Sequence, residues 1–191
     1  MGQYELTITD VNNCVTTEMF DLVQPSRLSM TIESSVSIDG NYNINCYGAK
    51  TGIVKLSAIN NIGLVDYRWG DGFLGSERPN MKAGNYKIII SDSNNCNADS
   101  TVTLTQPDPI LIGFETTNPF CPEKSDGEII SEASGGIPGN SFTYKWSDGS
   151  TDKVITNIPA GEYKVTVTDL NGCLVKDSVR KRYEQNMPYS S

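Results

Sequence analysis

The chain has 191 residues, of which 23 are acidic, 15 are basic and none is histidine. The net charge of −8 disfavours nucleic acid and anionic membranes as partners, because both attract clustered Lys and Arg. The lack of histidine excludes a Ser-His-Asp triad and every metal site built on imidazole. Since no run of about 18 apolar residues occurs, neither a transmembrane helix nor membrane insertion is expected.

Three stretches of the chain, 2–14, 84–96 and 161–173, are nearly the same text. Each has Gly-x-Tyr, then an alternating apolar strand, then Asp-x-Asn-x-Cys. Tyr4 recurs as Tyr86 and Tyr163, at spacings of 82 and 77 residues. A repeat of this length indicates a tandem array of small domains. We expect a partial repeat at 1–26, complete repeats at 27–108 and 109–182, and a tail or linker at 183–191.

The first stretch, 1–26, is expected to be the C-terminal hairpin of a truncated preceding repeat. Tyr4, Leu6 and Ile8 alternate along one of its faces, which the hairpin alone leaves uncovered. We therefore expect a neighbouring chain, or further sequence of a longer protein, to cover this face.

The first complete repeat, 27–108, has a longer beginning than the second. It has 21 positions from Pro25 to Cys46, against 14 from Pro107 to Cys121. The extra residues lie near 34–42 and favour a loop or an extended hairpin. A strand at 76–81 is doubtful, because Pro79 interrupts it.

The second complete repeat shows the strand pattern most clearly. Tyr163, Val165 and Val167 point to one face, and Lys164, Thr166 and Thr168 to the other. Turn residues separate six such strands, which predicts an all-β fold of tandem Ig-like antiparallel β-sandwiches. The predicted strands are 110–117, 127–133, 141–146, 153–158, 163–169 and 174–179.

Two aromatic positions in each repeat are expected to be structural core residues. Trp69 and Trp146 lie between the cysteines of their repeats, where they would fill the space between the sheets. Tyr86 and Tyr163 follow an Ala-Gly turn, a pattern that resembles a tyrosine corner.

The five cysteines sort by spacing into one pair per repeat. Cys46 and Cys96 are 50 residues apart, and Cys121 and Cys173 are 52 apart. Counting strands in alternating directions places both members of a pair at the same end of the sandwich. We therefore expect a disulfide within each repeat and an oxidising compartment, with reduced buried thiols as the alternative. Cys14 is left unpaired by truncation, because its counterpart would precede Met1.

The combination Trp-x-Asp-Gly, Ala-Gly-x-Tyr and Asp-x-Asn-(Gly/Asn)-Cys resembles the SprB repeat of cell-surface adhesins in gliding Bacteroidetes. It resembles more distantly the polycystic-kidney-disease-type (PKD-like) domain. The resemblance implies an extracellular protein, exported by type IX secretion, whose repeats are spacer segments in a surface filament. Its partners would be other repeats of the same protein and a surface polysaccharide or external substratum. Gln24-Pro25 and Gln106-Pro107 link successive repeats, whereas the matching residues 183 and 184 are Tyr and Glu.

The leading hypothesis is a non-enzymatic structural segment of such an adhesin, involved in gliding motility and surface attachment. The alternative is a carbohydrate-binding or spacer module of a secreted hydrolase. Stacking of sugar rings on exposed aromatic side chains would support it, and the candidates are Tyr42, Tyr47, Phe73 and Phe120. No catalytic residue is predicted, because the paired carboxylates of hydrolases need a cleft.

No cofactor is expected, and calcium is a weaker alternative. Two turns supply oxygen ligands of the kind that calcium prefers. The candidates are Asp92, Asn94, Asp169 and Asn171. The same Asp-x-Asn pattern is an ordinary turn signal, so no metal site is assigned.

Overall fold

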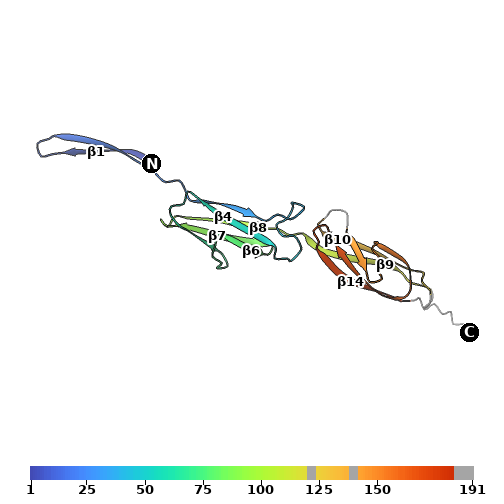
Figure 1. Cartoon of the computed structure of the whole chain (residues 1–191). Coiled ribbons are helices and arrows are strands. Elements are labelled where there is room, and N and C mark those ends of the chain that lie inside the picture. The colour runs from blue at the N-terminus through green and yellow to red at the C-terminus, as the bar shows by residue number, and fades with distance from the viewer. Residues whose placement is uncertain (120–123, 138–141, 183–191) are drawn as a thin grey trace, which may run out of the picture.

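The computed structural model describes residues 1–119, 124–137 and 142–182, and every regular element in these ranges is a β-strand. Three units follow one another along an extended molecule: an N-terminal hairpin, a first module and a second module (Figure 1). We use "first module" for the strands between 29 and 104 and "second module" for those between 108 and 181.

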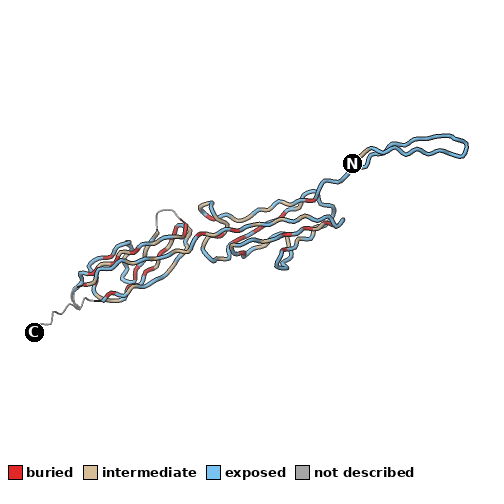
Figure 2. Tube along the Cα trace, turned by 180° about the vertical axis from the view of Figure 1, so that it is seen from behind, coloured by how far each residue is buried: buried red, intermediate tan, exposed pale blue. Residues whose placement is uncertain are grey.

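The N-terminal hairpin consists of β1 (Gly2–Thr9) and β2 (Val15–Leu22), paired antiparallel along their whole length. Tyr4 stacks on Phe20 across the pair, with ring centroids 6.0 Å apart. Both rings remain about half exposed, at 48% and 46%. Nearly the whole hairpin is exposed in Figure 2, so the cover that the sequence calls for remains a prediction.

The first module is a sandwich of two three-stranded antiparallel sheets. One sheet has the order β3-β4-β6 and the other β5-β7-β8. These match the A-B-E and C-F-G strands of an immunoglobulin domain without strand D. The strands are β3 (Ser29–Ser34), β4 (Gly52–Ile59), β5 (Val65–Trp69), β6 (Glu77–Met81), β7 (Gly84–Asp92) and β8 (Asn97–Leu104).

The second module repeats this topology, with sheets β9-β10-β12 and β11-β13-β14. The prediction of an all-β chain of Ig-like sandwiches is therefore confirmed. The strands are β9 (Asp108–Thr117), β10 (Gly127–Gly136), β11 (Thr143–Trp146), β12 (Val154–Ile158), β13 (Gly161–Thr168) and β14 (Leu174–Lys181).

Each module buries one tryptophan between its sheets. The indole Nε1 of Trp69 donates to the Gly75 carbonyl, and that of Trp146 to the Asp152 carbonyl, both at 3.0 Å. The tyrosine corners also match. Tyr86 donates its hydroxyl to the Lys82 carbonyl at 2.9 Å, and Tyr163 to the Pro159 carbonyl at 3.0 Å. These bonds satisfy the polar ends of large aromatic side chains at the core.

Two local expectations for the first module have different outcomes. Residues 35–51 form a loop, one of the two predicted forms. The doubt about a strand at 76–81 was wrong, because β6 forms there and pairs with β4. Since β6 lies at the edge of its sheet, Pro79 removes a donor where an edge strand can do without one.

Candidate functional site

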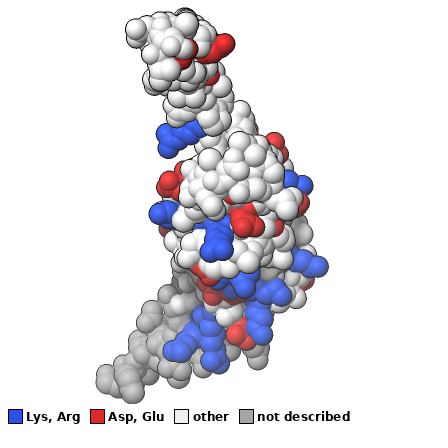
Figure 3. Space-filling model, turned by 90° about the vertical axis from the view of Figure 1, so that its left-hand side faces the viewer, with Lys and Arg blue, Asp and Glu red and all other residues white. Residues whose placement is uncertain are grey.

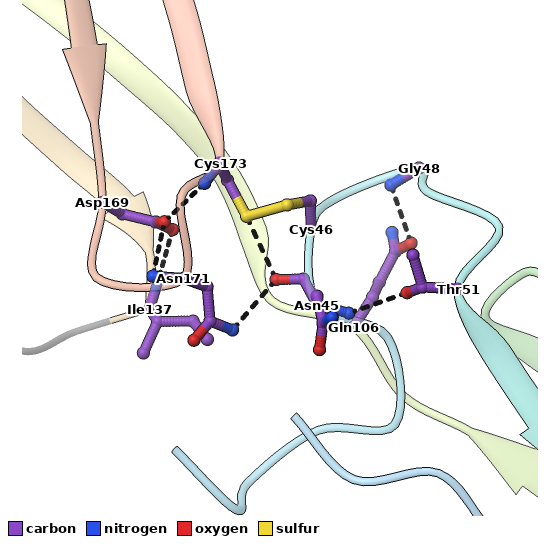
Figure 4. The surroundings of a disulfide bond; sticks show 9 residues. All are labelled: Asn45, Cys46, Gly48, Thr51, Gln106, Ile137, Asp169, Asn171 and Cys173. Carbon is purple, nitrogen blue, oxygen red and sulfur yellow. Dashed lines mark hydrogen bonds between the residues drawn. A yellow bond between two sulfur atoms is a disulfide. The ribbon is translucent and has the colours of Figure 1, made fainter. Parts of the chain in front are cut away.

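The most distinctive site in the described chain is a disulfide between the two modules. Cys46, in the 35–51 loop of the first module, is bonded to Cys173, in the β13–β14 hairpin of the second (Figure 4). The two residues are 127 positions apart in sequence, and their Cα atoms are 5.6 Å apart. The junction therefore has two covalent connections, the disulfide and the peptide linker between β8 and β9.

The loop that carries Cys46 is held against the end of β8. The backbone N–H groups of Asn43 and Ile44 both donate to the Thr105 carbonyl, at 3.1 and 3.0 Å. The Thr105 N–H donates in return to Asn43 Oδ1 at 2.9 Å. Ile44 is fully buried, which anchors the loop in the core of the first module. Cys46 is thus fixed at the end of the first module that faces the second.

The Gln-Pro linker motif has a structural role at the same place. Gln106 Oε1 accepts the Gly48 N–H at 2.9 Å, which ties the linker to the cysteine loop. Pro107 is fully buried at the junction. A hollow of about 430 Å³ lies beside it, lined in part by Cys46, Tyr47 and Cys173.

The hairpin that carries Cys173 is organised by one carboxylate. Asp169 Oδ1 accepts the N–H groups of Asn171 and Cys173, at 3.0 and 2.9 Å. Asp169 Oδ2 accepts the Ile137 N–H at 3.2 Å, which joins the hairpin to the neighbouring loop. Gly172 has a φ of 79°, the left-handed conformation that this tight turn requires.

The hairpin also contacts the loop directly, beside the disulfide. Asn171 Nδ2 donates to the Asn45 carbonyl oxygen at 3.2 Å, and Cys173 Sγ lies 3.1 Å from the same oxygen. The disulfide is therefore accompanied by polar contacts that orient the two partners (Figure 4).

The predicted pairing of cysteines within each repeat was wrong. Cys46 is bonded to Cys173 and not to Cys96, while Cys96 and Cys14 are free and exposed. Cys121, the predicted partner of Cys173, lies outside the described residues. Within the first module, Cys96 immediately precedes the start of β8. The Cys46 loop is hydrogen-bonded to Thr105, which follows the other end of β8. At about 3.3 Å per residue, an eight-residue strand separates these points by roughly 26 Å, and a disulfide needs Cα atoms within about 7 Å.

The physical reason is an extra reversal of the chain between β5 and β6. After β5 the chain turns back, so that Leu74 bridges Arg68 antiparallel. It then turns again as it crosses to the other sheet, where the Ser76 carbonyl accepts the Leu56 N–H at 2.7 Å and continues the register of β6 with β4. A count of one reversal per loop misses the second of these two turns. That count therefore places the β7–β8 hairpin at the wrong end of the module.

The four calcium candidates lie in the two hairpins, where the carboxylates of Asp92 and Asp169 accept backbone N–H groups of their own turns. Asp92 is 6% exposed. Burial alone would raise the pKa of Asp92, but the N–H groups of Ile62, Cys96 and Asn94 hold its pKa below the usual value. Among the described residues, no group of three or more Asp, Glu, Cys or His side chains is arranged to hold a metal.

The sugar-stacking candidates occupy different settings. Phe73 packs edge-on against Trp69, with ring centroids 6.2 Å apart. Tyr47 is 59% exposed beside the junction, whereas Tyr42 is partly buried. Phe120 lies outside the described residues. Over the described part of the chain, the ring contacts do not gather these aromatic side chains into one platform.

Comparisons with known proteins add a loose structural match. No family model matches the chain, and no curated protein matches it. One solved structure, an IgVJ-C2 molecule from amphioxus, is 16% identical and covers 83% of this chain and 97% of its own, with a TM-score of 0.30. A superposition this loose carries no argument about this chain. In the described ranges, no helix is long and apolar enough to span a membrane.

Proposed function

We propose that this chain is a structural segment of a secreted, filamentous cell-surface adhesin that acts in attachment and gliding motility. The observation that carries the proposal is the Cys46–Cys173 disulfide, which fastens one Ig-like module to the next. This disulfide also supports export from the cell, because structural disulfides persist in oxidising compartments. Under this proposal the export route is type IX secretion.

The other prominent residues support a non-enzymatic role. The repeated aromatic residues fill cores, and Asp92 and Asp169 hold turns. On the face shown in Figure 3, Lys and Arg side chains of the described residues are interspersed with Asp and Glu. Such a mixed surface suits a spacer, which must stay soluble and does not bind a highly charged ligand.

The position of the disulfide suits a segment that bears tension. When the chain is pulled from residues 27 and 182, the shortest covalent path runs from 27 to 46, across the sulfurs, and from 173 to 182. Residues 47–172 then form a closed loop that tension cannot extend. At about 3.4 Å per residue, this loop withholds roughly 43 nm of chain.

Surface display is the direct test. An antibody raised against residues 27–182 should label filaments on intact source cells, and external protease should remove the label without lysis. Deletion of the gene should reduce attachment and surface translocation. Labelling that appears only after the cells are lysed would refute the proposal.

The mechanical part is tested by pulling single molecules from residues 27 and 182. The oxidised protein should lack the long extensions of module unfolding, and Cys46→Ser should restore about 43 nm of released length. Cys96→Ser, which removes a free thiol, is the matched control and should behave like the parent. Equal release from the oxidised parent and Cys46→Ser would contradict the proposal that tension passes through the disulfide.

A further inference from the structure

The β7–β8 hairpin of the first module is built like the hairpin that carries Cys173. Asp92 Oδ1 accepts the N–H groups of Asn94 and Cys96, both at 2.9 Å. Asp92 Oδ2 accepts the Ile62 N–H at 3.1 Å. These are the same three bonds that Asp169 makes in the second module. Asn95, with a φ of 61°, takes the left-handed place of Gly172.

The two hairpins differ in whether a neighbouring loop is bound. In the second module, Cys173 is bonded to Cys46 and the Asn171 amide donates to the Asn45 carbonyl. In the first module, the equivalent residues Cys96 and Asn94 are both exposed, and Cys96 is free. The first module thus presents, already folded, the arrangement that holds a disulfide in the second.

We propose that the Cys96 hairpin is a docking site for the Asn-Cys loop of another module of this kind, and that Cys96 forms a disulfide with that loop. The occupant is a second copy of residues 43–49 of the 35–51 loop. It is carried by a preceding module, at the end that faces the Cys96 hairpin. Each module then has an acceptor hairpin at one end and a donor loop at the other. Repetition of this joint gives a rod fastened covalently at every junction.

The geometry favours a loop from another module over the module's own loop. The donor loop and the acceptor hairpin lie at opposite ends of the first module, separated by the length of β8. A hollow lined in part by Arg27, Leu28 and Ala98 lies on the first module where Pro109, Ile110 and Val175 line the hollow at the junction. The end of the module around Cys96 is therefore open where the corresponding end of the second module meets its neighbour.

Bond formation between the two thiols releases two protons and two electrons. A small-molecule disulfide, such as oxidised glutathione, accepts them. The first thiolate attacks it and expels one thiolate, and the second protein thiolate then attacks the mixed disulfide and expels the other. One disulfide forms and one is reduced, so the exchange balances.

The test duplicates the donor end ahead of the acceptor. A second copy of residues 27–108 is inserted after residue 26 of the full chain, the protein is oxidised with glutathione, and its disulfides are mapped by mass spectrometry. We expect the added copy's Cys46 to bond to the original Cys96, and the original Cys46 to remain bonded to Cys173. The added copy's own Cys96 should stay free.

Two controls keep the outcome decisive. Cys96→Ser in the original module should raise the number of free thiols by one, because the added Cys46 loses its partner. If the added module instead forms its own Cys46–Cys96 bond, the same change lowers the number by one, and the proposal is overturned. A variant with Ser at the added copy's Cys96 removes that competitor. An added Cys46 that remains free there, in protein that has formed the Cys46–Cys173 bond, also overturns the proposal.

The inference goes beyond the proposed function and fails separately from it. Mapping reports how modules are joined, whereas labelling of intact cells reports where the protein is displayed. A chain that is displayed but joined only at the Cys46–Cys173 junction would refute this proposal and leave the adhesin assignment standing.

Discussion

The two modules share one topology but fill the same position in different ways. In the first module, Arg78 is paired with Asp71, with an Nη1–Oδ1 distance of 2.9 Å. Its guanidinium also lies about 5 Å from the centroids of three rings, those of Trp69, Phe73 and Tyr86. In the second module, the equivalent residue is Ile155, which is 4% exposed and belongs to the core.

The difference shows which features the fold requires. Both modules keep the tryptophan, the tyrosine corner and the Asp-held hairpin, because these set the layers and the turns. The residue next to the tryptophan can be a stacked cation or an aliphatic side chain, since either covers the indole. The modules should therefore respond alike to changes in shared features and differently to acid and salt.

Removing the tryptophans should give the largest effect. Trp69→Ala and Trp146→Ala each leave a large cavity, and each should lower the free energy of unfolding of its module by about 3–5 kcal/mol. The chain contains two tryptophans, one per module, so fluorescence of the remaining one reports the undamaged module. Under reducing conditions that module should keep its midpoint in urea, while circular dichroism reports the loss. A shift in both modules would show that they unfold as one unit.

Truncating the differing position should separate the modules. Ile155→Ala removes fully packed aliphatic atoms and should cost about 2–4 kcal/mol. Arg78→Ala removes a partly exposed stacked cation and should cost about 1–2 kcal/mol. Urea unfolding of each variant in low and high salt provides the measurement. Only the cost of Arg78→Ala should fall in 1 M salt, because screening weakens the Arg78–Asp71 pair. Equal salt dependence of Arg78→Ala and Ile155→Ala would contradict this difference between the modules.

Acid should destabilise the first module through Asp71, which is paired with Arg78. In the second module, Asp148 takes the place of Asp71 and Ile155 takes the place of Arg78. The hydrogen bond from Arg78 holds the pKa of Asp71 below its ordinary value of 3.8. A carboxyl with a lowered pKa stabilises the fold above its unfolded-state pKa, and this contribution is lost as pH falls through the folded-state value. The first module should therefore lose stability below about pH 4, and Asp71→Asn should make its unfolding midpoint less dependent on pH there.

The matched control for the acid experiment is Asp148→Asn, at the equivalent position of the second module. Asp148 accepts the Ser150 N–H at 2.9 Å, within its own turn. Fluorescence of Trp69 in a Trp146→Phe background reports the first module alone, in which Asp148→Asn should leave the pH dependence intact. An unchanged acid transition in Asp71→Asn would refute the role of the Arg78 pair.

The same contrast shows how far sequence patterns lead. Alternation around Tyr163, Val165 and Val167 predicted β13, and the Ala-Gly-x-Tyr turn predicted the corner, because both depend on neighbours in sequence. The partner of Cys46 could not be found this way, since it depends on the direction of every strand between. One unnoticed extra turn between β5 and β6 reverses that count.

A signal for the joint was nevertheless present in the sequence. An odd number of cysteines fits pairing between successive repeats as well as pairing within them. Gln-Pro occurs twice in this chain, at 24–25 and 106–107, each time at a repeat boundary. At the second boundary, Gln106 is the residue that contacts the Cys46 loop. What the pattern could not supply was the end of the module at which that loop lies.

The smallest effect concerns the position at the end of the last strand. Leu104 closes the core of the first module, whereas the second has Lys181, only 2% exposed, with its ammonium donating to the carbonyls of Thr117 and Glu128. Lys181 is the middle residue of a run of three basic side chains, 180–182, yet it is buried. Burial lowers the pKa of Lys181, which the charge of Glu128 partly offsets.

A lysine with a lowered pKa favours folding more when it is neutral. The second module should therefore gain stability as pH rises from the folded-state pKa of Lys181 toward its unfolded value near 10.5. The melting temperature should rise by a few degrees, followed with Trp146 fluorescence in a Trp69→Phe background. Lys181→Met keeps an unbranched side chain without the charge and should remove this rise, while the first module, with Leu104 at the same place, should show none. A rise that persists in Lys181→Met would assign the pH dependence to another group and remove this distinction between the modules.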